Sequence, residues 1–427
     1  MFHWNKLIFL IQLYMKLSLA LPKNCKYKDK LIEKYDYEEL VTFMQNKKEP
    51  IHRWFYYKEG YAPELVSDLI KKFKLNSPIL DPFAGTGTTL LTCKQNDIDS
   101  IGFDITPLAV FVSKVKLERD YDLDELHEKI IKLTNLRYMP PKIKWHSDII
   151  NLKQAFSKYA YNDICFFKEN IIKIQDEKIR NFIMLGLLSI LGQASYTIKD
   201  GGFVRIKKGK KKHLPPVRHL LKRQLKKMFK ELKDQKNGDA KANIYLGDAR
   251  SLELNDNSVS AVITSPPYLN NVDYTKIYTL ELSLLEDNVR NLKEIRRNAI
   301  RSHIGAVYEP DEDENKNKNK IPENVKKIID KFSNPGIPLI ARGYFEDMYL
   351  SLAEMHRVLK KGVFAFIVVA NAQFSDVTID VDTTLAELAE EIGFKLEEIW
   401  VAKVRWADVY KIRKERPVRE SIVILRK

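Results

Sequence analysis

Short apolar segments alternate with amphipathic segments along most of this 427-residue chain, and this alternation constrains the fold more than any other feature. The short segments have the length and apolar character of buried strands, whereas the longer ones repeat apolar residues every three or four positions, as helices do. Because strands that alternate with helices pair in parallel, the pattern predicts an α/β fold with a doubly wound, mainly parallel sheet. We expect strands at Ser77–Phe83, Asp99–Asp104, Asn243–Leu246, Val259–Thr264, Val363–Ala370, Lys395–Val404 and Ser421–Leu425.

Helices are expected between these strands. The clearest is a run of apolar residues from Phe345 to Leu359 at helical spacing, which Gly362 ends. Further helices are expected at Gly85–Gln95, at Pro107–Leu117 and at Leu385–Ile392.

A large insertion interrupts the alternation between about residues 120 and 240. It contains an apolar helix at Phe182–Leu191 and then a basic stretch, Lys199 to Lys236, with 15 Lys and Arg against 3 Asp and Glu. Most of the chain's net charge of +15 therefore lies in this stretch. We expect an N-terminal extension (1–50), a first part of the core (51–120), a mainly helical, basic insertion (121–240), and a second part of the core (241–427) with a flexible loop near 309–320.

The basic stretch has two interpretations. Its Leu221–Leu232 segment places apolar residues on one helical face with lysines and arginines around the rest, which is typical of a solvated surface helix. The Gly201-Gly202 start and the Pro215-Pro216 break instead indicate a mobile basic loop suited to phosphate contacts. The candidate DNA-binding residues are Lys207, Lys208, Lys210, Lys211, Lys212 and Arg218.

Several classes of protein are excluded. The three cysteines, Cys25, Cys93 and Cys165, have no CxxC spacing, so neither a disulfide framework nor a zinc site is expected. The apolar stretch Leu7–Tyr14 lacks a clear signal cleavage site, and 181–198 holds too many polar residues and glycines for a membrane span. We expect a cytoplasmic protein that does not enter the membrane, although Met1 and Met15 are both candidate starts.

A glycine-rich turn joins the first expected strand to its helix. It runs from Asp81 to Thr89 (DPFAGTGTT), at the carboxyl end of a strand, where doubly wound sheets bind cofactors. The turn is neither GxGxxG nor a P-loop, so dinucleotide and nucleoside triphosphate binding fit poorly. Asp104 ends the next strand, where its carboxylate either accepts hydrogen bonds from ribose hydroxyls or caps the helix that begins at Pro107.

A second turn, Thr264 to Tyr268 (TSPPY), follows the strand at Val259–Thr264. Proline has no N–H, so Pro266 and Pro267 leave carbonyl acceptors without competing donors, and Ser265 adds another acceptor. Tyr268 adds a flat aromatic face. The turn therefore has the groups needed to hold a planar base by its amino group, although a Pro-Pro turn is sometimes only a stiff loop.

These two turns resemble motifs I and IV of the S-adenosylmethionine-dependent DNA methyltransferases that modify exocyclic amines, most closely those of the N4-cytosine type with Ser-Pro-Pro-Tyr. Residues 53–65 (with RWF, KEG and PEL) resemble motif X of this family, Asp104 lies at motif II, and Gly247-Asp248-Ala249 resembles motif III. The resemblance implies a Rossmann-like methyltransferase sheet. The motif order departs from the family's standard permutations, so the target-recognition region is expected first in the insertion and second in 290–340.

The resemblance also implies roles for individual residues. S-adenosylmethionine is the expected cofactor and double-stranded DNA the expected partner, with a cognate restriction endonuclease as a possible second partner. The expected catalytic residues are Ser265, Pro266, Pro267 and Tyr268. The expected cofactor-binding residues are Asp81, Phe83, Gly85, Gly87, Thr88, Asp104 and Asp248.

The expected reaction is a direct transfer of an activated methyl group to the N4 amine of a cytosine that is flipped out of the duplex. Methylation at carbon 5 would need a cysteine nucleophile after a proline, and none of the three cysteines follows one. Three alternatives stay open: N6-adenine methylation of DNA, amine methylation of tRNA, and nucleic-acid binding without catalysis.

Overall fold

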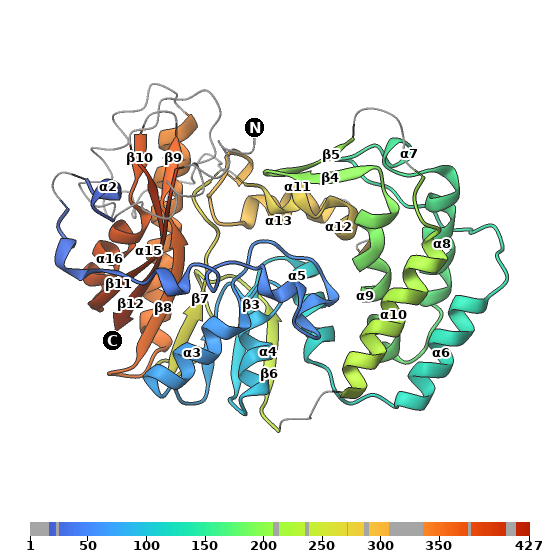
Figure 1. The fold of residues 1–427 in the computed structure, drawn as a ribbon, viewed down its shortest axis with the longest axis horizontal. Coiled ribbons are helices and arrows are strands. Elements are labelled where there is room, and N and C mark those ends of the chain that lie inside the picture. The colour runs from blue at the N-terminus through green and yellow to red at the C-terminus, as the bar shows by residue number, and fades with distance from the viewer. Residues whose placement is uncertain are drawn as a thin grey trace, which may run out of the picture.

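A computed structural model describes residues 17–22, 25–207, 213–234, 239–270, 272–285, 290–306, 336–374, 377–406 and 416–427. Its centre is an eight-stranded sheet in the order β1-β11-β12-β8-β7-β2-β3-β6 (Figure 1). Neighbouring strands are parallel except at β12, which is antiparallel to both β11 and β8. The strands are β1 (Leu31–Glu33), β2 (Ile79–Asp81), β3 (Ser100–Asp104), β6 (Ala242–Leu246), β7 (Ala261–Thr264), β8 (Phe364–Ala370), β11 (Lys395–Arg405) and β12 (Val418–Arg426).

Helices cover both faces of the sheet, which confirms the expected α/β architecture. Alternate residues of β8 show why: Phe366 and Val368 pack in the cluster that contains Leu69 of α3, whereas Ile367 and Val369 pack in the cluster of α15 and α16. Both faces of the strand are therefore apolar, as its sequence predicts. The core helices are α3 (Pro63–Phe73), α4 (Thr88–Gln95), α5 (Pro107–Leu117), α15 (Gly336–Val358) and α16 (Val381–Ile392).

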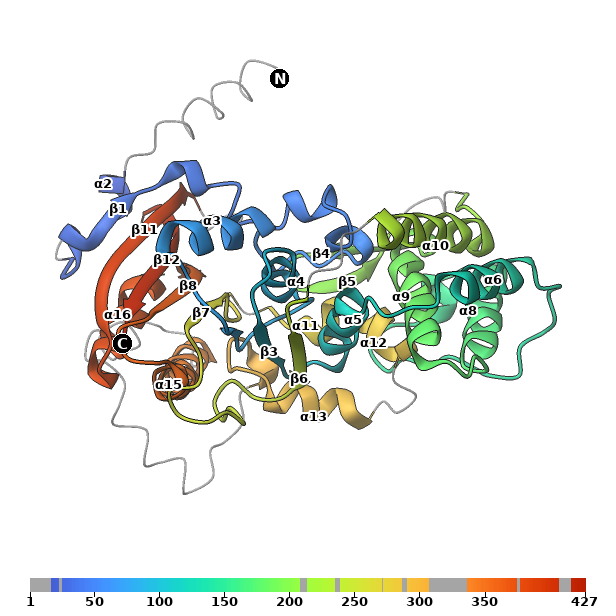
Figure 2. The ribbon, with the colours of Figure 1, turned by 90° about the horizontal axis from the view of Figure 1, so that it is seen from below.

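The segment between α5 and β6 forms a helical layer beside the sheet (Figures 1 and 2). The predicted apolar helix is α9 (Glu177–Ala194), which is buried and packs against α10 (Val217–Asp234). The apolar face of α10 is buried and its lysines lie mostly outside, as its periodicity predicts. The other helices of this layer are α6 (Leu123–Asn135), α7 (Leu152–Ala155) and α8 (Lys158–Ile171).

A β-hairpin stands where we expected the start of a mobile loop. Gly201 and Gly202 form the turn between β4 (Thr197–Asp200) and β5 (Phe203–Ile206), which pair antiparallel. Glycine at positive φ, here +58° at Gly201, suits a tight hairpin turn. Residues 208–212 of the predicted loop lie outside the described residues.

Short helices follow β7 and lead from the sheet toward the helical layer. They are α11 (Tyr274–Ile277), α12 (Thr279–Leu285) and α13 (Arg290–Asn298). A second hairpin, β9 (Ala372–Phe374) with β10 (Val377–Ile379), follows β8. The predicted loop at 309–320 lies outside the described residues.

The N-terminal residues 17–50 add to the core. β1 pairs in parallel with β11 and forms one edge of the sheet, and α2 (Leu17–Ala20) ends beside β12.

Five short 3₁₀ turns occur in the described chain, at Lys28–Lys30, Tyr35–Tyr37, Gln45–Lys47, His52–Trp54 and Ile304–Ala306.

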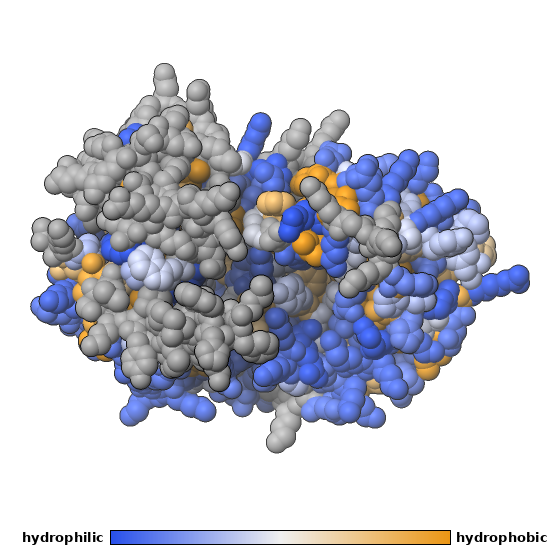
Figure 3. All heavy atoms as spheres, turned by 45° about the horizontal axis from the view of Figure 1, so that its top comes forward, coloured by the Kyte–Doolittle hydropathy of each residue, from blue (hydrophilic) through white to orange (hydrophobic). Residues whose placement is uncertain are grey.

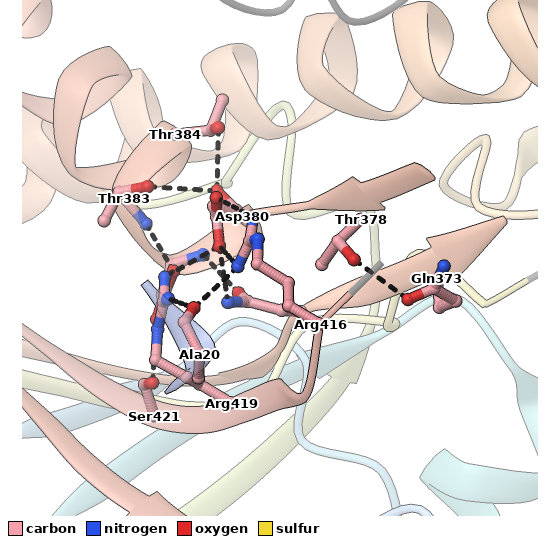
Figure 4. A network of polar contacts seen from close by, with 11 residues as sticks. Ala20, Gln373, Thr378, Asp380, Thr383, Thr384, Arg416, Arg419 and Ser421 are labelled. Carbon is pink, nitrogen blue, oxygen red and sulfur yellow. Dashed lines mark hydrogen bonds and ion pairs between the residues drawn. The ribbon is translucent and has the colours of Figure 1, made fainter. Parts of the chain in front are cut away.

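A buried network of ions holds β12, α16 and α2 together (Figure 4). Arg419, whose side chain is fully buried, contacts Asp382 through Nη2 at 2.7 Å and Asp380 through Nη2 at 2.9 Å. Arg416 pairs with Asp380 as well, and both arginines donate a hydrogen bond of 2.6 Å to the Ala20 carbonyl. Because each charge is paired at close range, the network fixes the orientation of β12.

Candidate active site

The carboxyl ends of β6, β3, β2 and β7 meet at one edge of the sheet, and a cavity of about 380 Å³ lies there. Of the predicted residues, it is lined by Phe83, Gly85, Asp104, Asp248 and Ser265–Tyr268. These residues come from four separate parts of the sequence. The structure therefore brings together the two predicted turns, as expected from the topology of a parallel sheet.

The glycine-rich turn is shaped by two glycines in the left-handed region. Gly85 has φ +51° and Gly87 has φ +79°, and Gly87 directly precedes α4. A Cβ at Gly87 would lie 2.8 Å from Ser113 Oγ. Only glycine combines this φ with this close approach, so the sharp turn depends on it.

Asp104 is one of the residues that line the cavity. Its Oδ2 accepts a hydrogen bond from the Gly85 N–H at 2.9 Å, and its Oδ1 accepts one from the Thr106 N–H at 2.8 Å. The Thr106 side chain also hydrogen-bonds this carboxylate, and the acceptor capacity that remains can serve a further donor. Burial raises the pKa of this carboxyl above its ordinary value. Asp104 therefore ties the glycine-rich turn to the loop before α5 and lines the cavity. Thr106 is the N-cap of α5 and no side chain caps that helix, so the expected alternative of a helix cap at Asp104 is wrong.

Three predicted cofactor residues lie behind the cavity wall. Asp81 is buried and accepts hydrogen bonds from Thr264 Oγ1 at 2.7 Å and from Thr89 Oγ1 at 2.6 Å. It thus joins the end of β7 to α4, and burial raises its pKa to about 6. Gly87 and Thr88 form the start of α4 and do not line the cavity. We therefore assign these three residues to shaping the turn.

Asp248 lines the cavity as part of an ion-pair chain. Arg250 Nη2 contacts Asp248 Oδ2 at 2.7 Å, and Arg250 Nη1 contacts Asp347 Oδ1 at 3.1 Å. Asp347 is buried and pairs in turn with Arg301. The Asp248 carboxylate is therefore held in place from α15, a link that the sequence motif alone does not reveal.

The Ser-Pro-Pro-Tyr turn forms the opposite wall. The Tyr268 hydroxyl donates a hydrogen bond of 3.2 Å to Glu420 Oε1 on β12, and Glu420 also lines the cavity. Burial raises the pKa of Glu420. Sequence reasoning missed Glu420, and the only signal available was a carboxylate beside the apolar strand that begins at Ser421.

A cluster from the segment resembling motif X closes one side. Tyr57 stacks on Tyr278 with ring centroids 4.9 Å apart, and Tyr278 donates a hydrogen bond to Glu59. Glu59 Oε1 is buried and accepts no hydrogen bond in the described part of the chain, and burial raises the pKa of this carboxyl. The same oxygen lies 3.9 Å from Lys58 Nζ, so Glu59 is paired at long range but keeps an acceptor position that a ligand donor can fill.

Sequence reasoning also missed a group of polar side chains that follow the Ser-Pro-Pro-Tyr turn in the sequence. Asp273 caps α11 and its Oδ2 lies 2.8 Å from Arg296 Nε. His303 is buried beside this pair and its Nδ1 has no hydrogen-bond partner among the described residues. Burial lowers the pKa of His303.

Of the candidate DNA-binding residues, the structure describes two, Lys207 and Arg218. Lys207 is exposed at the end of the β4–β5 hairpin. Arg218 instead packs inward, donating a 2.7 Å hydrogen bond to the Thr134 carbonyl and lying over the Phe167 ring. Lys208, Lys210, Lys211 and Lys212 lie outside the described residues. In the ranges described, no helix is long and apolar enough to cross a membrane.

Comparisons with known proteins decide the family. A family model described as DNA methylase matches residues 15–114. The chain is 30% identical over 424 residues to Type II methyltransferase M.BsoBI of Geobacillus stearothermophilus, covering 86% of this chain and 83% of that protein. This chain belongs to the Type II DNA methyltransferases.

Other relatives of this methyltransferase match along most of its length. It is 28% identical over 439 residues to M.AvaI of Nostoc sp., covering 92% of this chain and 88% of the relative. It is 23% identical over 406 residues to M.MvaI of Kocuria varians, covering 84% and 86%. The expected cofactor of this methyltransferase, S-adenosylmethionine, is confirmed with the family.

Proposed function

We propose that this methyltransferase methylates the exocyclic N4 amine of cytosine within a specific sequence of double-stranded DNA. The observation that carries the proposal is the presence of Ser265–Tyr268 in the same cavity as Gly85 and Asp104. The N4-cytosine enzymes that the chain resembles have serine before Pro-Pro-Tyr, whereas N6-adenine enzymes usually have Asp or Asn. A serine hydroxyl is small and uncharged, which suits a neutral amine.

The cofactor half of the cavity is formed by Asp104, Asp248 and Glu59. When bound, S-adenosylmethionine supplies an activated methyl group on a cationic sulfur. The remaining acceptor capacity of Asp104 suits a ribose hydroxyl, and Asp248 suits the adenine amine. Glu59 Oε1 accepts no hydrogen bond from the described residues, and its ion pair with Lys58 is long at 3.9 Å, so it suits a hydrogen-bond donor at the methionine end.

The base half is formed by Ser265, Pro266 and Tyr268. Ser265 Oγ and the Pro266 carbonyl accept hydrogen bonds from the two hydrogens of the target amine, so its lone pair points into the cavity. The Tyr268 ring offers a stacking face, and its hydroxyl is held by Glu420. These contacts fix the distance and direction of attack, which is the main task of an enzyme whose methyl donor is already reactive.

Sequencing DNA for modified bases tests this proposal. DNA from cells that produce the protein should carry N4-methylcytosine at one short sequence, protected against an endonuclease of the same specificity, its proposed partner. DNA from cells producing Ser265→Ala should carry much less. N6-methyladenine at that sequence would replace the proposed target atom, and unmodified DNA with both proteins folded would reject the proposal.

A further inference from the structure

The β4–β5 hairpin stands at the rim of the cavity and is held there by three contacts. Lys58, which lines the cavity, donates a hydrogen bond of 2.8 Å to the Gly201 carbonyl at the hairpin turn. Lys199 pairs with buried Glu281 at 2.8 Å and lies 3.8 Å from the centre of the Tyr278 ring. The hairpin is therefore fixed relative to the wall formed by Tyr57 and Glu59.

One face of β5 packs against the rest of the protein, and its other face is exposed. Val204 and Ile206 pack into the cluster that contains Tyr274 of α11, which lines the cavity. Because side chains alternate along a strand, Phe203, Arg205 and Lys207 lie on the opposite, exposed face. That face presents one aromatic ring and two cations.

Phe203 is one of the exposed aromatic residues near the cavity, with 51% of its surface exposed. It directly follows the Gly201-Gly202 turn and so stands at the hairpin tip. Figure 3, which brings the top of Figure 1 forward, shows apolar atoms exposed beside hydrophilic ones on the side where this hairpin lies. An exposed apolar ring at the tip of a hairpin beside the cavity can stack on a base.

We propose that Phe203 inserts into the DNA base stack and fills the gap that the flipped target base leaves. The inference rests on the proposed function, because only a base that leaves the duplex creates such a gap. Flipping costs a few kcal/mol of stacking and pairing, and apolar side chains that enter a base step offset this cost. Lys207, which is exposed, follows Phe203 on the same face of the hairpin, where it matches a negative phosphate on one side of the gap. A two-stranded ribbon also has the width of the major groove.

The test compares single-turnover methyl transfer to two duplexes of the methylated sequence found by sequencing. In the first, the target base is paired normally, and in the second it lies opposite an abasic site, so that it leaves the stack more easily. Phe203→Ala should slow transfer on the paired duplex by about 10- to 100-fold and on the abasic duplex by less than about threefold. Phe203→Leu, which keeps an apolar side chain, should recover most of the rate.

Tyr159→Ala is the matched control, since Tyr159 is an aromatic residue on α8 that is 84% exposed. It should leave both rates unchanged. Equal slowing of Phe203→Ala on both duplexes would overturn the proposal, and so would an unchanged rate on the paired duplex. If the unaltered protein methylated neither duplex, the proposed function would fail instead, so the two failures are distinguishable.

Discussion

Asp104 has a structural role in the described chain and a proposed role in cofactor binding. Its oxygens hold the Gly85 and Thr106 amides and face the cavity. Asp104→Ala should weaken S-adenosylmethionine binding by about 1–3 kcal/mol, the scale of lost charge-assisted hydrogen bonds. Isothermal calorimetry measures this. Tyr268→Ala should bind the cofactor normally while losing turnover. Unchanged affinity in Asp104→Ala would leave Asp104 with only its structural hydrogen bonds to Gly85 and Thr106.

His52 predicts a pH dependence of stability. It is buried beside Lys116, and burial lowers its pKa from 6.5 to about 3. Between these values the unfolded chain binds one proton more than the folded chain, so the neutral ring's contribution is complete above pH 6.5 and decreases as the pH falls. The slope is about 1.4 kcal/mol per pH unit.

His52→Gln removes this titration. Between pH 7.5 and pH 5.0 the variant should lose about 2 kcal/mol less free energy of unfolding than the parent protein. Urea denaturation at the two pH values gives the comparison. An identical loss in both proteins would show that His52 takes up its proton as readily in the folded state as in the unfolded chain, which would contradict the prediction.

At the scale of elements, β12 depends on the Arg419 network. Asp382→Ala removes one carboxylate from a fully buried guanidinium and should lower the free energy of unfolding by about 3–5 kcal/mol, measured by urea denaturation. Glu397→Ala is the control, because its partner Lys395 is largely exposed; its effect should stay within about 1 kcal/mol. A comparable effect of both substitutions would mean that the buried network adds little.

The sequence predicts those elements whose signals are local. Helix α5 has the predicted bounds, Pro107–Leu117, because Pro107 fixes its first turn. The β4–β5 hairpin was missed because the surrounding lysines indicated a solvated loop, although Gly-Gly between alternating residues is itself a hairpin signal. β1 was missed because three residues are too short for a pattern, and its pairing with β11 joins residues that lie over 360 positions apart.

Within the site, too, the sequence predicts the residues that belong to a local pattern and misses those that do not. Gly85 and Ser265 stand in recognisable turns, so their meeting in one cavity follows from the parallel sheet. Glu420 and Arg250 act through partners that lie 152 and 97 positions away in the sequence. No local pattern contains such contacts. The three buried members of the glycine-rich turn show the converse limit, since a motif does not say which of its residues face the ligand.

For the whole molecule, the concentration of positive charge in residues 199–236 predicts how DNA binding depends on salt. If Lys207, Lys208, Lys210, Lys211 and Lys212 contact phosphates, replacing them with glutamine should weaken binding to all DNA sequences alike. The slope of log affinity against log salt should fall by about 0.9 per lost contact, as measured by fluorescence anisotropy. Replacing two other exposed lysines, Lys71 of α3 and Lys361 before β8, should leave the slope unchanged. The same unchanged slope in the five-lysine variant would return this cluster to the role of a solvated surface.

The central claim is that this molecule transfers a methyl group to an amine of a DNA base. Its most direct measurement is mass spectrometry of nucleosides after the purified protein has been incubated with S-adenosylmethionine carrying a deuterated methyl group and with either duplex DNA or tRNA. We predict deuterated N4-methylcytosine from the DNA, nothing from the tRNA, and loss of the signal in Ser265→Ala. Label in tRNA alone, or in no nucleoside, would contradict the account.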